Sequence, residues 1–97
     1  MLRGRVVNNK KIVIRGADVA PGSHVALFSR DRGVYVILLL GDGDPEVSIT
    51  AYENNSYESL KGNDPAIWVA EGAVRISALN TSTSPKKTPT IEVLSIG

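Results

Sequence analysis

The stretch from Val34 to Tyr52 reads Val-Tyr-Val-Ile-Leu-Leu-Leu-Gly-Asp-Gly-Asp-Pro-Glu-Val-Ser-Ile-Thr-Ala-Tyr. Its first part consists of β-branched, aromatic and leucine residues, which favour a β-strand. The glycine, aspartate and proline residues in the middle are those that turns require. A second apolar segment follows the turn. This stretch therefore predicts a β-hairpin at the centre of a sheet.

The two arms of this predicted hairpin differ in their pattern of apolar residues. In the second arm, Val47, Ile49 and Ala51 share one face, and polar residues alternate with them. In the first arm both faces are apolar: one carries Val34, Val36, Leu38 and Leu40, and the other carries Tyr35, Ile37 and Leu39. A strand with two apolar faces needs two layers to cover it. One layer is the core of the domain, and we expect another subunit or a partner surface to supply the other.

The rest of the chain also reads as short strands between turns. No apolar pattern with a period of 3.6 residues is sustained, and turn signals such as Pro21-Gly22 and Gly62-Asn-Asp-Pro65 recur. We expect strands in the segments 2–7, 11–15, 24–29, 57–60, 67–70, 74–79 and 90–96, besides the two arms above. The fold class that follows is all-β, with eight or nine short strands that form a β-sandwich or a small barrel.

Length and composition indicate one domain, residues 1–97, with a basic N-terminal hairpin at 1–15 and an exposed, flexible loop at 80–89. The chain has no cysteine, so disulfides and cysteine-ligated zinc are excluded. A net charge of +1 argues against a dedicated nucleic-acid binder. There is neither a signal-peptide pattern nor a membrane-spanning apolar run, and we expect no membrane partner.

The charged residues are unevenly distributed along the chain. Residues 1–15 contain five basic residues and no acid, whereas residues 42–71 contain seven acids and the single base Lys61. These two regions could pair within one molecule or between neighbouring molecules in an assembly. The alternative is that they are solvated charges on exposed strand faces.

A search for catalytic and metal-binding patterns finds little. The single histidine, His24, has no nearby acid in the sequence, so it is interpreted as a surface or edge residue. Asp42, Asp44 and Glu46 offer oxygen ligands, but Val47 stands where a calcium loop needs glycine, so an ordinary acidic loop is favoured. Trp68 is expected in the core or an interface. We therefore expect no enzyme activity and no cofactor.

Four segments, taken in order, resemble a known pattern: Gly22-Ser-His-Val-Ala-Leu27, Val47-Ser-Ile49, Trp68-Val-Ala-Glu-Gly72-Ala-Val-Arg75-Ile76 and Thr90-Ile-Glu-Val-Leu94. Their layout over residues 20–96 resembles the small jelly-roll-like decoration, or cement, proteins of tailed bacteriophages. The resemblance implies an antiparallel, jelly-roll-like β-sandwich of eight or nine short strands. It further implies a non-catalytic protein, made in the host cytoplasm, that stabilises a capsid from the outer surface of the virion. It also implies a trimer that bridges subunits of the major capsid protein.

The residues expected at such an interface are the basic residues of the N-terminal segment and the apolar residues of the doubly apolar strands. They are Arg3, Arg5, Lys10, Lys11, Arg15, Tyr35, Ile37, Leu39, Leu94 and Ile96. The alternative function is a carbohydrate- or ligand-binding β-module, which would need aromatic side chains exposed to its ligand.

Overall fold

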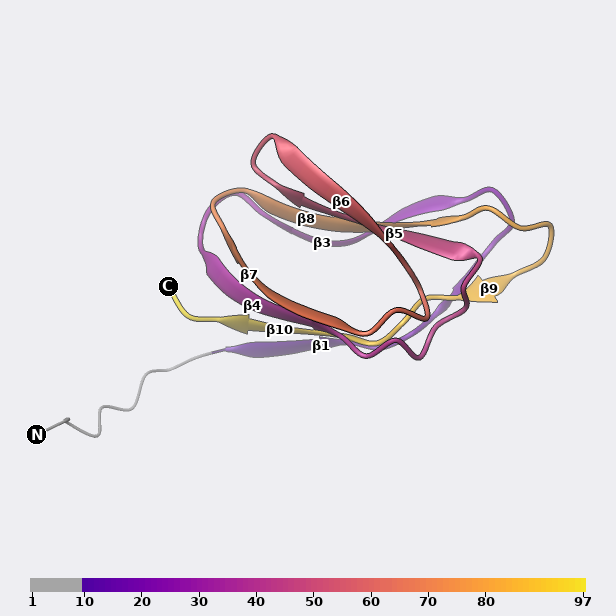
Figure 1. Cartoon of the computed structure of the whole chain (residues 1–97), viewed down its shortest axis with the longest axis horizontal. Coiled ribbons are helices and arrows are strands. Elements are labelled where there is room, and N and C mark those ends of the chain that lie inside the picture. Colours follow the sequence, from indigo (N-terminus) through magenta and orange to yellow (C-terminus); the bar gives the residue numbers. More distant parts are fainter. Residues whose placement is uncertain (1–9) are drawn as a thin grey trace, which may run out of the picture.

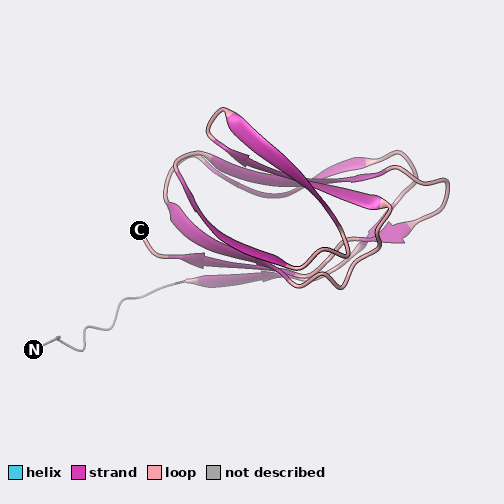
Figure 2. Ribbon diagram, in the orientation of Figure 1, coloured by secondary structure: helices cyan, strands magenta, loops and turns pink. Residues whose placement is uncertain are grey.

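The computed structural model describes residues 10–97 and contains ten strands joined by loops, with no helix in that range (Figure 2). The strands are β1 (Lys11–Ile14), β2 (Asp18–Val19), β3 (His24–Arg30), β4 (Val34–Leu39), β5 (Val47–Glu53), β6 (Ser56–Lys61), β7 (Ala66–Glu71), β8 (Val74–Asn80), β9 (Lys86–Lys87) and β10 (Ile91–Ser95). The first arm of the predicted N-terminal hairpin, with Arg3 and Arg5, lies outside the described residues.

Eight of these strands form two antiparallel four-stranded sheets that pack face to face (Figure 1). The strand order is β1-β10-β4-β7 in one sheet and β3-β8-β5-β6 in the other, while β2 and β9 form a small separate ribbon. When the eight long strands are counted in chain order, the two sheets read 1-8-3-6 and 2-7-4-5. This is the strand order of a jelly roll. The predicted all-β, jelly-roll-like sandwich is therefore confirmed.

The predicted central hairpin is wrong, because its two arms lie in different sheets. β4 pairs with β10 and β7, whereas β5 pairs with β8 and β6. The Gly-Asp-Gly-Asp-Pro segment reverses the chain direction and also carries the chain from one layer to the other (Figure 1). Turn residues specify a reversal of the chain, but the partners of a strand are set by contacts distant in sequence.

The core lies between the inner faces of the two sheets. Tyr35, Ile37 and Leu39 of β4 face it together with Val47 and Ile49 of β5, all at most 6% exposed. The opposite side chains of β4 are only half-buried, so the strand alternates between the core and the surface. The division of the first arm into two apolar faces and the alternation predicted for the second arm are therefore confirmed, although the arms belong to different layers.

The segment 80–89, expected to be an exposed loop, is anchored to the sandwich at its two ends, while most residues of 81–87 are exposed. It contains β9, and its Asn80 and Thr88 side chains are almost completely buried. The Asn80 amide donates hydrogen bonds to the Val19 and Ser84 carbonyl oxygens, each at 2.8 Å. The polar residues that suggested a solvated loop are used to bond the backbone of this segment.

Candidate functional site

The outer face of the β1-β10-β4-β7 sheet carries five of the seven large apolar side chains that are exposed in the described residues. Strand pairing aligns side chains across all four strands in rows on this face. One row is Lys11, Leu94, Val36 and Val69, and the next is Val13, Glu92, Leu38 and Ile67. Val34, Leu40 and Ile96 adjoin these rows. We call this set of eleven residues the outer face.

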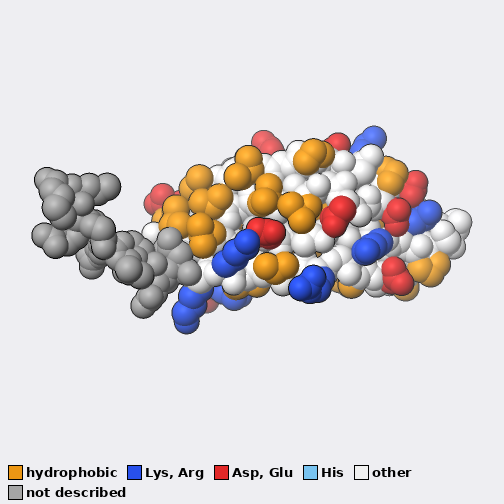
Figure 3. Space-filling view, turned by 90° about the horizontal axis from the view of Figure 1, so that it is seen from below, with side chains coloured by type: hydrophobic (Ala, Val, Ile, Leu, Met, Phe, Trp, Pro, Cys, Tyr) orange, Lys and Arg blue, Asp and Glu red, His pale blue; other side chains and the backbone are white. Residues whose placement is uncertain are grey.

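Several apolar side chains of the outer face are strongly exposed (Figure 3). Ile67 is 68% exposed and Val69 59%, and three others lie between 43% and 45%: Val13, Leu40 and Ile96. An isolated exposed apolar residue is ordinary, but monomeric proteins rarely expose contiguous apolar patches. The apolar side chains aligned on the four adjacent strands form such a patch, with the Lys11–Glu92 ion pair on its β1 side. This surface is suited to contact with another protein.

The structure divides the predicted interface residues into two groups. Leu94 and Ile96 lie on the outer face, as the interface prediction requires. Tyr35, Ile37 and Leu39 are buried in the core and are not available to a partner, so their assignment to an interface is wrong. Both faces of β4 are apolar, and the pattern alone did not show which one turns inward.

The sequence reasoning missed Ile67 and Val69, which are the most exposed members of the outer face. They alternate along β7 with Trp68 and Ala70, which point inward. Trp68 packs against the core, and Ala70 belongs to it. Alternation in Ala66–Glu71 was the signal that could have found them.

Among the predicted basic interface residues, those within the described range cluster at β1. Lys10, Lys11 and Arg15 are exposed. The Lys11 ammonium forms an ion pair with Glu92 on the outer face, with 2.8 Å between Nζ and Oε1. One edge of the apolar face therefore carries positive charge, part of which is already neutralised.

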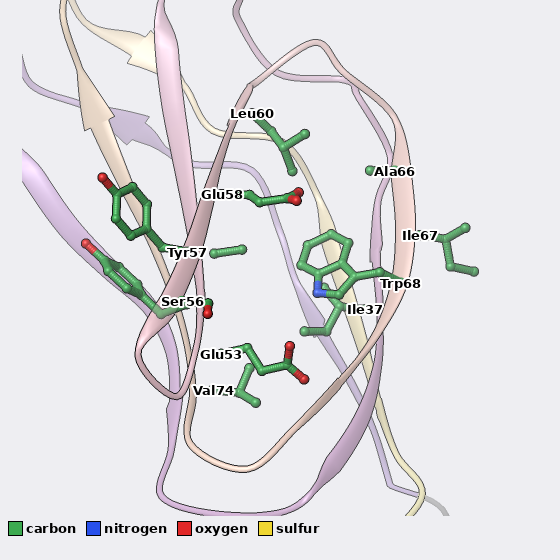
Figure 4. Close-up of a pocket in the computed structure, with 12 residues that line it drawn as sticks. Ile37, Glu53, Ser56, Tyr57, Glu58, Leu60, Ala66, Ile67, Trp68 and Val74 are labelled. Atoms are coloured by element: carbon green, nitrogen blue, oxygen red, sulfur yellow. The ribbon is translucent and has the colours of Figure 1, made fainter.

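A pocket of about 400 Å³ opens between the two sheets where β6 and β7 lie at their edges (Figure 4). Ile37 and Val74, almost completely buried, line its inner part, and Leu60 and Trp68 lie on opposite walls. The lining also contains two carboxylates, Glu53 and Glu58, and no lysine or arginine. The remaining lining residues are Ala51, Tyr52, Ser56, Tyr57, Ala66 and Ile67.

Hydrogen bonds between the two sheets close one end of the pocket. Oε2 of Glu53 accepts a hydrogen bond from the backbone N–H of Glu71 at 2.7 Å. The adjacent Asn54, with a φ of 55°, donates its side-chain amide to the Glu71 carbonyl and accepts from the Ala73 N–H. Gly72, with a φ of 104°, leaves the space that the Asn54 side chain occupies. The Glu53 carboxylate is therefore held in place at the pocket.

Carboxylates of the acidic loop after β4 accept hydrogen bonds from the segment that precedes β10. The N–H and hydroxyl of Thr90 donate hydrogen bonds to the Asp42 carboxylate at 2.7 and 2.8 Å. These bonds lower the pKa of Asp42 below its ordinary value. Asp44 accepts from the Lys87 N–H at 2.7 Å. Within residues 10–97, no group of three or more acidic, histidine or cysteine side chains could hold a metal ion.

Of the remaining candidates, His24 lies apart from the pocket and the outer face, whereas Tyr52 and Tyr57 belong to the pocket lining. His24 begins the edge strand β3 and is exposed, with its Nε2 3.1 Å from the Ser77 hydroxyl, which confirms its surface position. Tyr52 and Tyr57 lie side by side across β5 and β6, with ring centroids 5.7 Å apart. The sequence reasoning missed this pair because it considered aromatic neighbours only within one strand.

No protein-family model and no curated protein matches the sequence. Among solved structures, the chain is similar to one reported under the statement that Bacillus endospore appendages form a novel family of disulfide-linked pili. The TM-score is 0.60 at 11% sequence identity, over 90% of this chain and 84% of that chain. In the part of this chain that the structure describes, no helix is long and apolar enough to cross a membrane. At this identity the similarity establishes a shared β-sandwich fold.

Proposed function

We propose that this chain is a non-catalytic structural protein of a larger protein assembly, and that its outer face packs against another copy of the chain. The observation that carries the proposal is the contiguous apolar surface across β1, β10, β4 and β7 (Figure 3). In a closed ring, the outer face of each subunit could pack against the next subunit, which would bury it in every subunit.

The size of the exposed apolar surface indicates what kind of assembly it supports. Full burial of one valine, leucine or isoleucine side chain contributes about 1.5–3 kcal/mol. The five most exposed side chains of the outer face are 43–68% exposed, so covering all five contributes roughly 5 kcal/mol. Association costs about 4–15 kcal/mol in lost freedom of motion. A single contact is therefore weak, and stable binding needs several contacts repeated by symmetry.

Capsid decoration is the form of assembly that we propose first. In that role a trimer, held by outer-face contacts, binds the major capsid protein on a bacteriophage virion. The exposed basic residues at β1, which include Lys10 and Arg15, are suited to an acidic coat surface. The jelly-roll strand order agrees with the fold that the sequence resemblance implies.

A fibre subunit is the second form of assembly, and the similarity to the Bacillus appendage structure favours it. That structure is described as belonging to disulfide-linked pili. The present sequence contains no cysteine, so a fibre of this chain would have to be held by non-covalent contacts. Electron microscopy of the assembled protein separates the two forms, because decoration predicts closed oligomers and a fibre predicts filaments.

The proposal is tested by measuring the absolute mass of the untagged protein by light scattering over a wide concentration range. A trimer predicts three times the chain mass of 10.4 kDa. Val69→Lys places a charge in the proposed contact and should shift the protein towards monomer. Ser59→Lys adds the same charge on β6 of the other sheet and should leave the mass unchanged. A strict monomer that also fails to bind capsid shells would end the proposal.

A ligand-binding module remains the second candidate function, because the pocket beside Trp68 is large enough for a small ligand. It predicts binding to oligosaccharides in calorimetry, lost in Trp68→Ala. Equal binding by the wild-type protein and this variant would exclude the pocket as a carbohydrate site.

A further inference from the structure

The two walls of the pocket between β6 and β7 differ in chemistry. The wall formed by β5 and β6 carries Glu53 and Glu58, and both lie on the inner side of their strands (Figure 4). The opposite wall carries Trp68 and Ala66 of β7, with Ile37 behind them. An occupant that fits both walls has one basic face and one apolar face.

The N-terminal segment of the sequence, Met-Leu-Arg-Gly-Arg-Val-Val-Asn-Asn, has this pattern. In an extended chain, successive side chains point to opposite sides, so Arg3 and Arg5 share one face while Leu2 and Val6 share the other. The segment contains no acidic residue. Its composition therefore complements both walls of the pocket.

The spacing of the charges also agrees. Glu58 pairs with Ala51, and Ser56 pairs with Glu53, so the two glutamates are diagonal neighbours on adjacent strands. Diagonal neighbours are about 7–8 Å apart. Arg3 and Arg5 are two residues apart, or about 6.6 Å in an extended chain. Each arginine could therefore meet one carboxylate.

We propose that the pocket binds residues 2–7 of a second copy of this chain in an extended conformation. Arg3 and Arg5 pair with Glu53 and Glu58, and the apolar face of the segment covers Trp68. The hydrogen bond from the Glu71 N–H to Glu53 holds one of the carboxylates in position for this contact. The unpaired edges of β6 and β7 lie beside the pocket and offer backbone groups to an extended peptide.

The topology favours a second copy over the same molecule as the source of the segment. β1 and β7 are the opposite edges of their sheet, separated by three inter-strand steps, or about 14 Å. Entering the space between the sheets adds about 5 Å, half of the usual sheet separation. At about 3.4 Å per residue, the chain uses roughly six residues before it reaches its own pocket. Arg5 and Val6 would then remain outside it.

The pocket shares only Ile67 with the outer face, so variants at other positions let the two proposals fail independently. Outer-face variants such as Val69→Lys leave the lining of the pocket unchanged. Conversely, Glu53→Gln/Glu58→Gln changes the pocket and leaves the outer face unchanged. The amide that Glu53→Gln introduces keeps a carbonyl oxygen that can accept the hydrogen bond from the Glu71 N–H, so the end of the pocket should stay closed.

Trp68 is the single tryptophan of the sequence, so its fluorescence reports occupancy of the pocket directly. A synthetic peptide of residues 1–9 is added to the full chain carrying Arg3→Glu/Arg5→Glu, which weakens competition by the protein's own segment. We expect a saturable shift of Trp68 emission to shorter wavelength. Adding Glu53→Gln/Glu58→Gln to this acceptor should weaken peptide binding about tenfold. Adding Asp18→Asn/Asp31→Asn, which changes net charge equally away from the pocket, should not weaken it.

Cysteine trapping then identifies the source of the segment, because the natural sequence has no cysteine to interfere. Chains with Leu2→Cys are mixed with chains with Ser56→Cys, and we expect a disulfide-linked heterodimer under oxidising conditions. In the control, Asp31→Cys on the β3–β4 loop replaces Ser56→Cys. This pair of chains should form much less of the disulfide-linked heterodimer.

Three results would overturn the proposal. The first is a peptide that gives no saturable Trp68 shift, or a peptide with both arginines changed to glutamate that binds equally well. The second is a disulfide that forms within a single dilute chain carrying both Leu2→Cys and Ser56→Cys, while no disulfide forms between the two mixed single-cysteine chains. Equal weakening of peptide binding by the control Asp18→Asn/Asp31→Asn would equally contradict it.

Discussion

Replacement of the buried Asn80 by alanine should destabilise the protein by about 3 kcal/mol. The Asn80 side chain is 0% exposed. Its amide donates to the carbonyl oxygens of Val19 and Ser84, and its Oδ1 accepts from the N–H and hydroxyl of Ser82 at 2.9 and 2.8 Å. This single side chain therefore links β8 to β2 and to the first turn of the segment 80–89.

The loss of stability depends on which of the former hydrogen-bond partners of Asn80 can bond to water after the substitution. The bond to the Val19 carbonyl is buried, so this oxygen loses its side-chain donor at a cost of about 1–3 kcal/mol. The Ser82 and Ser84 groups are closer to solvent, and losing their three bonds costs about 0.5 kcal/mol each. The total of about 3 kcal/mol corresponds to a fall of about 15 °C in Tm for a domain of this size.

Urea unfolding followed by circular dichroism measures this loss, with the slope of the transition expected to stay unchanged. Ser82→Ala is the matched control, because it removes bonds from the same cluster but leaves the Val19 carbonyl paired; it should cost less than about 1 kcal/mol. If Asn80→Ala also costs less than about 1 kcal/mol, the segment 80–89 is not anchored by this side chain and the reasoning is refuted.

Three further predictions concern the turns and the core. Gly72→Ala should cost about 2 kcal/mol in urea unfolding, because the residue has a φ of 104° and a Cβ there would overlap the Asn54 side chain. Ile37→Ala should cost about 3–4 kcal/mol in the same assay, since the side chain is completely buried; a loss under about 1 kcal/mol would contradict the core assignment. The lowered pKa of Asp42 contributes stability that is present above its ordinary pKa and is lost as the pH falls through its lowered one. Asp42→Asn should therefore reduce the acid dependence of the urea midpoint, and an unchanged pH profile would argue against the Thr90 contacts.

Residue alternation was sufficient to predict the fold class and most of the strands. The two apolar faces of Val34–Leu40 and the alternation of Val47, Ile49 and Ala51 are both present in the structure. Alternation separates the two faces of a strand but does not identify the inner one when both are apolar. This is why Tyr35 was expected at an interface although it packs in the core against Phe28, with ring centroids 5.4 Å apart.

Features that depend on contacts distant in sequence could not be predicted. The pairing of β4 with β10 joins residues more than fifty positions apart, and no local pattern reports it. The segment 80–89 looks solvated by composition, yet its backbone is bonded by side chains such as Asp44 from the loop after β4. The pocket arises because β6 and β7, consecutive in the chain, are edges of different sheets. Neither edge position is encoded in the residues of the strand itself.

The most direct test of the central claim is the accessibility of the outer face in the assembled protein. A single cysteine is introduced by Val69→Cys, and its rate of reaction with a soluble thiol reagent is measured as the protein concentration rises. The matched control, Ser59→Cys, lies on β6 of the opposite sheet. We predict that Val69→Cys becomes protected as the protein associates, while Ser59→Cys keeps reacting at the rate of the dilute protein. Equal reaction rates for both variants at every concentration would contradict the assignment of the outer face as the assembly surface.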